Sequence, residues 1–148
     1  MGFEFNENQV ANVSRRRTRL CGERDRNENG YTPAMIKVSV FYPSSDGARF
    51  DMEYYGDRHM PMVQAKLGAA CKGIAVEHGV ACATPGSRPQ FMAMGRRYFD
   101  SLEEFQNELR PTREEFVADV PNYTNVQPVI QINEVVVALE PVAAREHA

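Results

Sequence analysis

Apolar and polar residues alternate along four stretches of this chain, and such a period of two predicts a strand in each. In the first stretch Ile36, Val38, Val40 and Tyr42 fall on one face, and mostly polar residues fall on the other. The second and third stretches are expected to pair as a hairpin, because a loop of turn-forming residues separates them. The predicted strands cover residues 36–42, 74–80, 91–99 and about 126–139.

A helix is expected between the first two strands. Asp51 is a good N-cap, and from it the helix runs to about Leu67, where Gly68 ends it. Pro61 lies inside this span. Because proline restricts the residue before it and readily begins a new helix, we expect two helical pieces with a bend at residues 59–60.

A second helix is expected between the last two strands. Ser101 and Glu104 have the spacing of a capping box, in which each side chain bonds the backbone of the other. Pro111 is expected to interrupt this helix, and residues 112–115 repeat the capping-box pattern to open a further turn. The order of elements is therefore β-α-β-β-α-β, the ferredoxin-like arrangement of the α+β class.

Helices cover only one face of such a sheet. Here the other face also carries apolar groups from several strands, and an apolar patch of that size needs a cover. Packing of this face against the same face of a second copy is the simplest solution. The sequence therefore predicts a homodimer.

Composition excludes several classes of protein. The chain has 148 residues, 43% of them apolar and 25% charged, which suits one folded domain. Its net charge of −3 gives no basic excess for binding nucleic acid, and no apolar run is long enough to span a bilayer. No signal peptide is visible, and the three cysteines lack the spacing of a disulfide framework or zinc ribbon. We expect a reduced, cytoplasmic protein.

The chain divides into three parts. Residues 1–34 have poor apolar periodicity and are expected to be a poorly ordered extension. Arginines cluster at residues 15–19, but acidic residues in the same extension argue against a nucleic-acid-binding arm. Residues 35–140 form the expected domain and residues 141–148 a tail. Met35 stands directly before the first strand, so it is a candidate for the natural start.

The first predicted helix carries the best candidates for catalysis. Tyr55 and His59 are four residues apart, so they share a helix face. Histidine titrates near neutrality and can act as an acid or a base, and a phenol beside it can orient a substrate carbonyl. In the alternative, purely structural interpretation, His59 bonds a backbone group freed by Pro61. We take His59 and Tyr55 as the catalytic candidates.

Three further residues are candidates for ligand binding: Tyr54, His78 and Gln131. His78 lies among apolar residues of the second strand, so a role in the core or an interface is its alternative. Gln131 is expected to point into a cavity. No metal-ligand spacing, Gly-rich phosphate loop or GxSxG motif occurs, so neither a metal nor a cofactor is expected.

Five segments of the chain, followed by Pro128, form a recognisable series: residues 35–40, 50–55, 59–63, 99–104 and 119–125. In this order and spacing they resemble the EthD (ethyl tert-butyl ether degradation) family of the dimeric α/β-barrel group. The resemblance implies a small homodimer with a cavity between sheet and helices in each subunit. Family members occur in ether-degrading gene clusters beside a cytochrome monooxygenase, and related proteins act in aromatic polyketide tailoring.

These observations predict an EthD-like dimer that binds a small apolar oxygenated or aromatic molecule. It would support degradation or tailoring of that molecule by acid/base chemistry without a cofactor. Two alternatives stay open. One is a non-catalytic ligand carrier or accessory subunit of an oxygenase system. The other is a cofactor-free monooxygenase, in which the substrate itself activates oxygen, so the sequence leaves open whether the protein is an enzyme.

Overall fold

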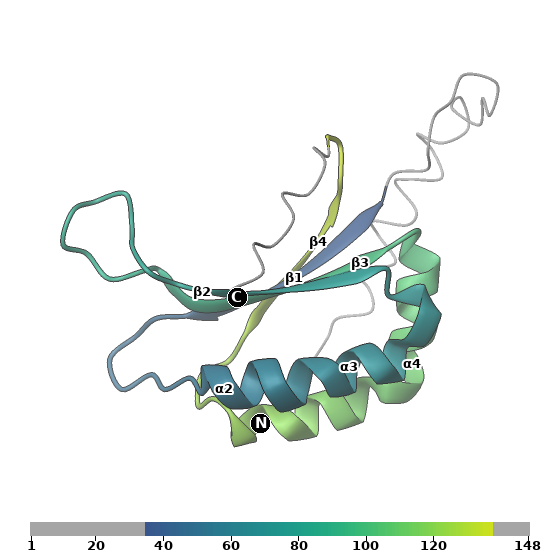
Figure 1. Cartoon of the computed structure of the whole chain (residues 1–148), viewed down its shortest axis with the longest axis horizontal. Coiled ribbons are helices and arrows are strands. Elements are labelled where there is room, and N and C mark those ends of the chain that lie inside the picture. The colour runs from purple at the N-terminus through teal and green to yellow at the C-terminus, as the bar shows by residue number, and fades with distance from the viewer. Residues whose placement is uncertain (1–34, 138–148) are drawn as a thin grey trace, which may run out of the picture.

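Four antiparallel strands form one sheet in the order β2-β3-β1-β4 (Figure 1). The structure is a computed structural model and describes residues 35–137. The expected extension of residues 1–34 and tail of residues 141–148 therefore lie outside the described residues. The predicted β-α-β-β-α-β arrangement of the α+β class is confirmed. The strands are β1 (Ile36–Pro43), β2 (Gly73–His78), β3 (Phe91–Phe99) and β4 (Val129–Glu134).

The second strand is shorter than predicted. Its last residue, His78, pairs with Ala93 of β3, and the chain then leaves the ladder. Val80, which was expected to continue the strand, is 87% exposed. Gly79 still donates its N–H to the carbonyl of Met92 over 2.9 Å, and a side chain would not fit at this position beside the carbonyl of Phe91. The hairpin between β2 and β3 is otherwise as predicted.

The last strand is also shorter than predicted, at both ends. Pro128 has no backbone N–H to donate to the sheet, so pairing begins only after it. At the other end Glu134 pairs with Ile36, the first residue of β1, and no further β1 residue is left to pair with. Val136 and Val137, predicted to be part of the strand, are exposed.

The first helical segment is continuous. It consists of α2 (Met52–Tyr54), the π-helical turn η1 (Tyr55–His59) and α3 (Met60–Leu67). Asp51 caps its start as predicted, since its side chain accepts a hydrogen bond from the backbone of Tyr54. The predicted bend is wrong, because the backbone keeps helical angles through the junction. Pro61 falls in the first turn of α3, where a missing N–H costs little.

The end of this segment is as predicted. Gly68 adopts a φ of 60°, which a residue with a side chain rarely tolerates, and it closes α3. A short 3-10 turn, η2 (Gly68–Ala70), then leads towards β2.

The second helix, α4 (Leu102–Asp119), is also continuous. Ser101 caps it as predicted, accepting a hydrogen bond of 3.1 Å from a backbone N–H in the first turn. The predicted interruption at Pro111 is wrong, because buried phenylalanines before and after the proline hold both halves on the sheet. Thr112 opens no second capping box. Its hydroxyl instead donates to the carbonyl of Glu108, 3.0 Å away, inside the helix.

The core between sheet and helices divides into two clusters. The apolar cluster consists of Ile36, Val38, Val63, Leu67, Cys71, Phe99, Leu102, Phe105 and Phe116. The tyrosine cluster consists of Val40, Tyr42, Tyr55, Met60, Ala93 and Tyr123. Both clusters draw on β1, β3 and the first helical segment. Residues of α4 belong to the apolar cluster, and Tyr123, which follows α4, belongs to the tyrosine cluster.

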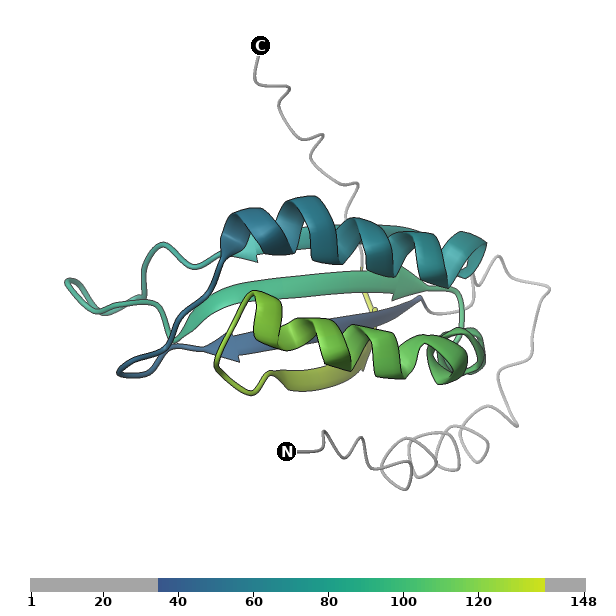
Figure 2. The ribbon, with the colours of Figure 1, turned by 90° about the horizontal axis from the view of Figure 1, so that it is seen from below.

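The helices lie side by side on one face of the sheet (Figure 2), and none of the described helices covers the other, open face (Figure 1). Phe41 and Met94 pair across strands on this open face, with Val129 of β4 beside them at 53% exposure. An ion pair of 3.1 Å between Arg96 and Glu77 lies on the same face. The open face is therefore a mixed surface with an apolar part.

Two further observations concern the cysteines and the length and hydrophobicity of the helices. Cys71 and Cys82 are both free thiols. Cys21 lies outside the described residues. Among the helices of residues 35–137, none is long and apolar enough to cross a membrane.

Candidate functional site

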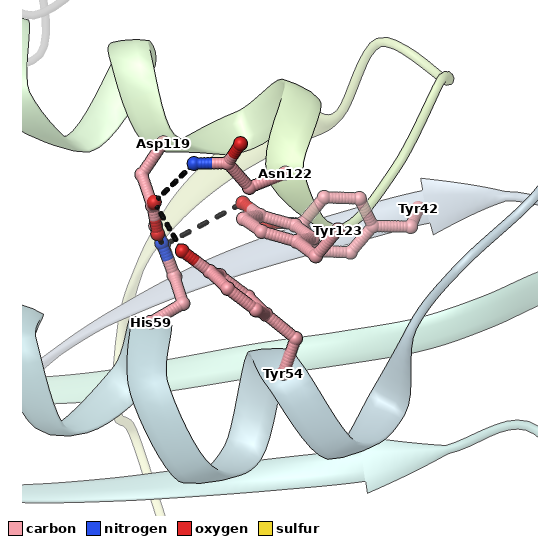
Figure 3. A network of polar contacts seen from close by, with 6 residues as sticks. All are labelled: Tyr42, Tyr54, His59, Asp119, Asn122 and Tyr123. Carbon is pink, nitrogen blue, oxygen red and sulfur yellow. Dashed lines mark hydrogen bonds and ion pairs between the residues drawn. The ribbon is translucent and has the colours of Figure 1, made fainter.

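The central contact of the site joins His59 and Asp119 (Figure 3). His59 ends η1 and Asp119 ends α4, so the contact also ties the two helical segments together. Nδ1 of His59 lies 2.8 Å from Oδ2 of Asp119, and His59 is only 2% exposed. Because an ionised carboxylate only accepts hydrogen bonds, Nδ1 carries the proton and Nε2 is left as an acceptor.

Asp119 is itself held by two further donors. The Tyr54 hydroxyl donates to its Oδ1 over 2.7 Å, and the Asn122 amide donates to the same oxygen over 2.9 Å. Asn122 comes from η3 (Val120–Asn122), the 3-10 turn that follows α4. Burial alone would raise the pKa of Asp119, but hydrogen bonds from Asn122, His59 and Tyr54 outweigh it and hold that pKa below its ordinary value. The carboxylate is therefore ionised.

His59 is kept neutral. Burial lowers its pKa below the ordinary value, and the hydrogen bond to Asp119 only partly opposes this. The positive charge of Arg97 lowers the pKa further. A neutral imidazole with a fixed tautomer, and with Nε2 ready to accept a proton, is the form that a general base requires.

Two tyrosines extend the network beyond Nε2. The Tyr123 hydroxyl lies 3.5 Å from Nε2 of His59, and it lies 2.8 Å from the Tyr42 hydroxyl (Figure 3). The 3.5 Å separation is at the limit of a hydrogen bond. Burial raises the pKa of both phenols above the ordinary value, so both keep their protons. Tyr123 and Tyr42 can therefore donate to an oxygen that carries negative charge.

Tyr55 supports His59 from the side. Its ring stacks on the imidazole, with 5.3 Å between ring centroids and 15° between planes, and it is fully buried. Its hydroxyl lies against Gly95, and among the described residues it has no hydrogen-bond partner of good geometry. Burial raises the pKa of Tyr55, and the neighbouring Arg97 and Tyr42 partly oppose this rise. Tyr55 thus fixes the plane of the imidazole.

Backbone contacts place Tyr123 beside His59. The segment after η3 is fastened to the loop before α2, since the N–H of Asp51 donates to the Tyr123 carbonyl over 2.8 Å. The Thr124 hydroxyl donates to the Arg49 carbonyl over 2.7 Å, and the Asn125 side chain accepts from the Arg49 N–H over 2.7 Å. These bonds bring the end of α4 and the start of the first helical segment to the same end of the sheet.

A cavity of about 80 Å³ lies between α4 and the sheet, and His59 forms part of its wall. A single water molecule needs roughly 10–15 Å³ of such cavity volume, so the cavity is large enough for a small molecule. Most of the wall consists of aliphatic and phenylalanine side chains of β1, β4 and α4. Its polar groups are His59, Tyr42, Tyr123, Arg97 and Arg113.

The structure brings some of the predicted residues together and leaves others apart. Tyr54, Tyr55 and His59 meet in one network, although only His59 lines the cavity. His78 is exposed at the end of β2. Gln131 lies on the open face of the sheet, where its amide donates to Asn133 over 2.7 Å. Its neighbour Ile130 lines the cavity, and successive strand residues point to opposite faces.

Sequence reasoning missed four residues: Asp119, Tyr123, Tyr42 and Arg97. The first two lie in residues 119–125, a segment that supported the family resemblance but was given no chemical role. Arg97 carried its own signal, because it is a charged residue at an inward position of an alternating strand. In the described part of the chain, no group of three histidine, cysteine or acidic side chains could hold a metal ion.

The chain was compared with known families, curated proteins and solved structures, and a solved structure of an EthD-like protein agrees with this fold. No family model matches the chain, and neither does any curated protein. The crystal structure of an EthD-like protein from Ralstonia eutropha is 50% identical, over 70% of this chain and 94% of that one, with a TM-score of 0.68. An ethyl tert-butyl ether degradation (EthD) family protein from Bacillus halodurans is 18% identical, over 68% of this chain and 97% of that one, with a TM-score of 0.49.

Proposed function

The chain belongs to the EthD family, and on this premise we propose that it binds a small, largely apolar oxygenated or aromatic molecule and moves a proton on it. His59 takes the proton on Nε2, and the imidazolium that forms is stabilised by the Asp119 carboxylate. The proton then returns to another atom of the bound molecule. No cofactor is required for such a transfer, which would support degradation or tailoring of the molecule.

The observation that carries this proposal is the 2.8 Å contact of His59 with Asp119. A histidine that only filled the core would need no ionised partner with two further donors. Here the carboxylate selects the tautomer in which Nε2 is the acceptor, and His59 lines the cavity. Tyr123 and Tyr42 supply protonated hydroxyls close to it, which suits the stabilisation of an enolate or phenolate oxygen.

The apolar wall of the cavity supports the class of ligand. Valine, leucine and phenylalanine side chains favour a hydrocarbon or aromatic body, and the few polar groups of the wall can bond its oxygen. Tyr54 and Tyr55 act through Asp119 and His59, so we propose them as positioning residues.

Deuterium exchange tests the proposed reaction. Native mass spectrometry of the purified protein identifies any molecule that accompanies it, and that molecule and a set of small aliphatic and aromatic ketones are then incubated with the protein in D₂O. We expect incorporation of deuterium at the acidic carbon. His59→Asn should slow it by about 10²–10⁴-fold, the usual yield of a positioned proton-transfer group.

Two controls make the exchange test specific. Asp119→Asn keeps the shape of the side chain but no longer selects the tautomer, so exchange should fall while the cavity stays intact. Asp46→Asn removes a carboxylate from an exposed pair with Arg88 and should change nothing. A ligand that binds equally to the wild type and His59→Asn without exchange in either would favour a carrier over an enzyme.

We also propose that two copies pack through the open face of the sheet. Phe41, Met94 and Val129 lie together there, and nothing among the described residues covers them as the helices cover the inner face. Multi-angle light scattering should give the mass of a dimer at micromolar concentration, and Met94→Lys should shift it to a monomer. A monomeric wild type would refute this arrangement and leave the His59 chemistry untouched.

A further inference from the structure

Arg97 is a buried cation on the wall of the cavity. It lies on the inner face of β3, opposite Val38, and is only 7% exposed. Its guanidinium carbon lies 6.0 Å from the ring centroid of Phe116, so an aromatic face covers one side of it. Burying a charge away from water is costly unless a partner of opposite charge or a set of hydrogen bonds offsets the lost hydration.

The described residues supply no such partner. Among residues 35–137, no carboxylate forms an ion pair with Arg97, and its Nε has no hydrogen-bond partner. Asp119, the acidic residue of the described site, is already engaged with His59, Tyr54 and Asn122. None of the residues that line the cavity in the described part of the chain is an aspartate or a glutamate.

The charge of Arg97 also acts on His59, which lines the same cavity. Burial lowers the pKa of the imidazole, and the charge of Arg97 lowers it further. The wall of the cavity thus contains the positive charge of Arg97, and no aspartate or glutamate of residues 35–137 lies on that wall.

From this arrangement we propose that the ligand is an anion, a small organic acid whose carboxylate binds Arg97. The apolar body of the acid then packs against the valine and phenylalanine side chains of the wall. Arginine suits this role because its planar fork of N–H groups matches the two oxygens of a carboxylate. The inference rests on the proposed function, because it names the class of molecule that would be presented to Nε2 of His59.

Paired probes separate charge from shape. Acetate, isobutyrate and benzoate are each compared with the corresponding neutral amide, and their dissociation constants are measured by NMR titration at fixed ionic strength. The wild type should bind at least one carboxylate more tightly than its amide. In Arg97→Met that preference should fall by about 10- to 100-fold, the range of charge-assisted hydrogen bonds. Arg97→Lys, which keeps the charge but loses the fork, should lie between them.

The matched control is Arg88→Gln, which removes the same charge from an exposed loop residue and should leave the preference unchanged. Melting curves verify folding, and Arg97→Met should melt no lower than the wild type because methionine needs no partner. Equal binding of acids and amides by the wild type, or an unchanged preference in Arg97→Met, overturns the proposal. His59→Asn should keep the preference, so a lost preference and a lost exchange reaction report on the anion site and on the proposed function separately.

Discussion

The two clusters of the core differ in the chemistry of their side chains. In the apolar cluster, Phe99 and its neighbours gain from burial and need no hydrogen-bond partner. In the tyrosine cluster, each tyrosine ring carries a hydroxyl group that is buried away from water and needs a hydrogen-bond partner. Tyr42 and Tyr123 solve this by pairing their hydroxyls at 2.8 Å, whereas the hydroxyl of Tyr55 finds no partner among the described residues.

This difference indicates which of the two clusters serves stability and which serves function. A core that served only stability would use phenylalanine in place of Tyr55, since an unpaired buried hydroxyl costs roughly 1–3 kcal/mol. The tyrosine cluster instead surrounds His59, with ring centroids 5.3 Å from Tyr55 and 4.6 Å from Tyr123. We therefore interpret the apolar cluster as the source of stability and the tyrosine cluster as the support of the proposed chemistry.

Truncation in the apolar cluster should have the largest effect on stability. Phe99 is fully buried, and its ring lies 5.1 Å from that of Phe105. Phe99→Ala removes this contact and leaves a cavity, so the free energy of unfolding should fall by about 3–5 kcal/mol. Urea denaturation measures the loss.

The same variant also tests the division of roles. The fraction of Phe99→Ala that stays folded should catalyse exchange like the wild type, because Phe99 is not among the residues that line the cavity and the His59 network lies in the other cluster. Tyr42→Phe is the matched change in the tyrosine cluster, and it should cost only about 1 kcal/mol of stability while it slows exchange. If Phe99→Ala slowed exchange per folded molecule as much as Tyr42→Phe, the two clusters could not be separated in this way.

The apolar cluster was largely predictable from the sequence. Two of its features are set by residues close together in the sequence, so they can be recognised from the sequence alone. They are the alternation along β1 and β3 and the helix cap at Ser101. The predictions failed at the two prolines. Whether Pro61 or Pro111 breaks a helix is decided by packing on the sheet, which is tertiary information.

The tyrosine cluster was predictable only in part. Tyr55 and His59 lie one turn apart, so local spacing was enough to bring them together. Asp119 is separated from His59 by 60 residues and reaches it because the end of α4 lies beside the first half of the first helical segment. Such a contact leaves no local pattern. Gln131 illustrates the opposite error, because a shift of one residue along a strand exchanges the two faces.

A methyl group at Gly95 should disturb the tyrosine cluster by an intermediate amount. A Cβ at position 95 would overlap the hydroxyl oxygen of Tyr55, whereas the nearest ring carbons of Tyr55 would lie 3.2 and 3.6 Å away. Because Tyr55 is fully buried and cannot swing away, Gly95→Ala should cost about 1–3 kcal/mol of stability. Chemical denaturation again provides the measurement.

The second substitution, Tyr55→Phe, sharpens this test. Alone it removes a hydroxyl without a partner, so stability should be unchanged or slightly higher. Combined with Gly95→Ala it removes the atom in conflict and should restore most of the loss. Additive effects in the double variant would mean that Gly95 is required for another reason, such as the pairing of β3 with β1.

The smallest effect should appear in the pH dependence of stability. His59 has a pKa below its ordinary value of 6.5, chiefly because of burial, so near pH 6 the unfolded chain binds a proton that the folded protein does not. Stability should therefore fall as pH drops through 6.5, and this loss should stop at the lower pKa of the folded state. The slope for one proton is at most about 1.4 kcal/mol per pH unit.

Asp119 acts in a separate and more acidic window. Its pKa is held below the ordinary 3.8 by the hydrogen bonds that outweigh its burial, so its stabilising contribution is complete above 3.8 and is lost as pH falls further. Denaturation of the wild type and His59→Asn from pH 3 to pH 8 distinguishes the two groups. His59→Asn should abolish the loss that begins at 6.5 and keep a loss below 3.8, since Tyr54 and Asn122 still donate to Asp119. An unchanged profile near pH 6 would mean that His59 is as easily protonated in the folded protein as in the unfolded chain, and the tyrosine cluster would then not hold a neutral base.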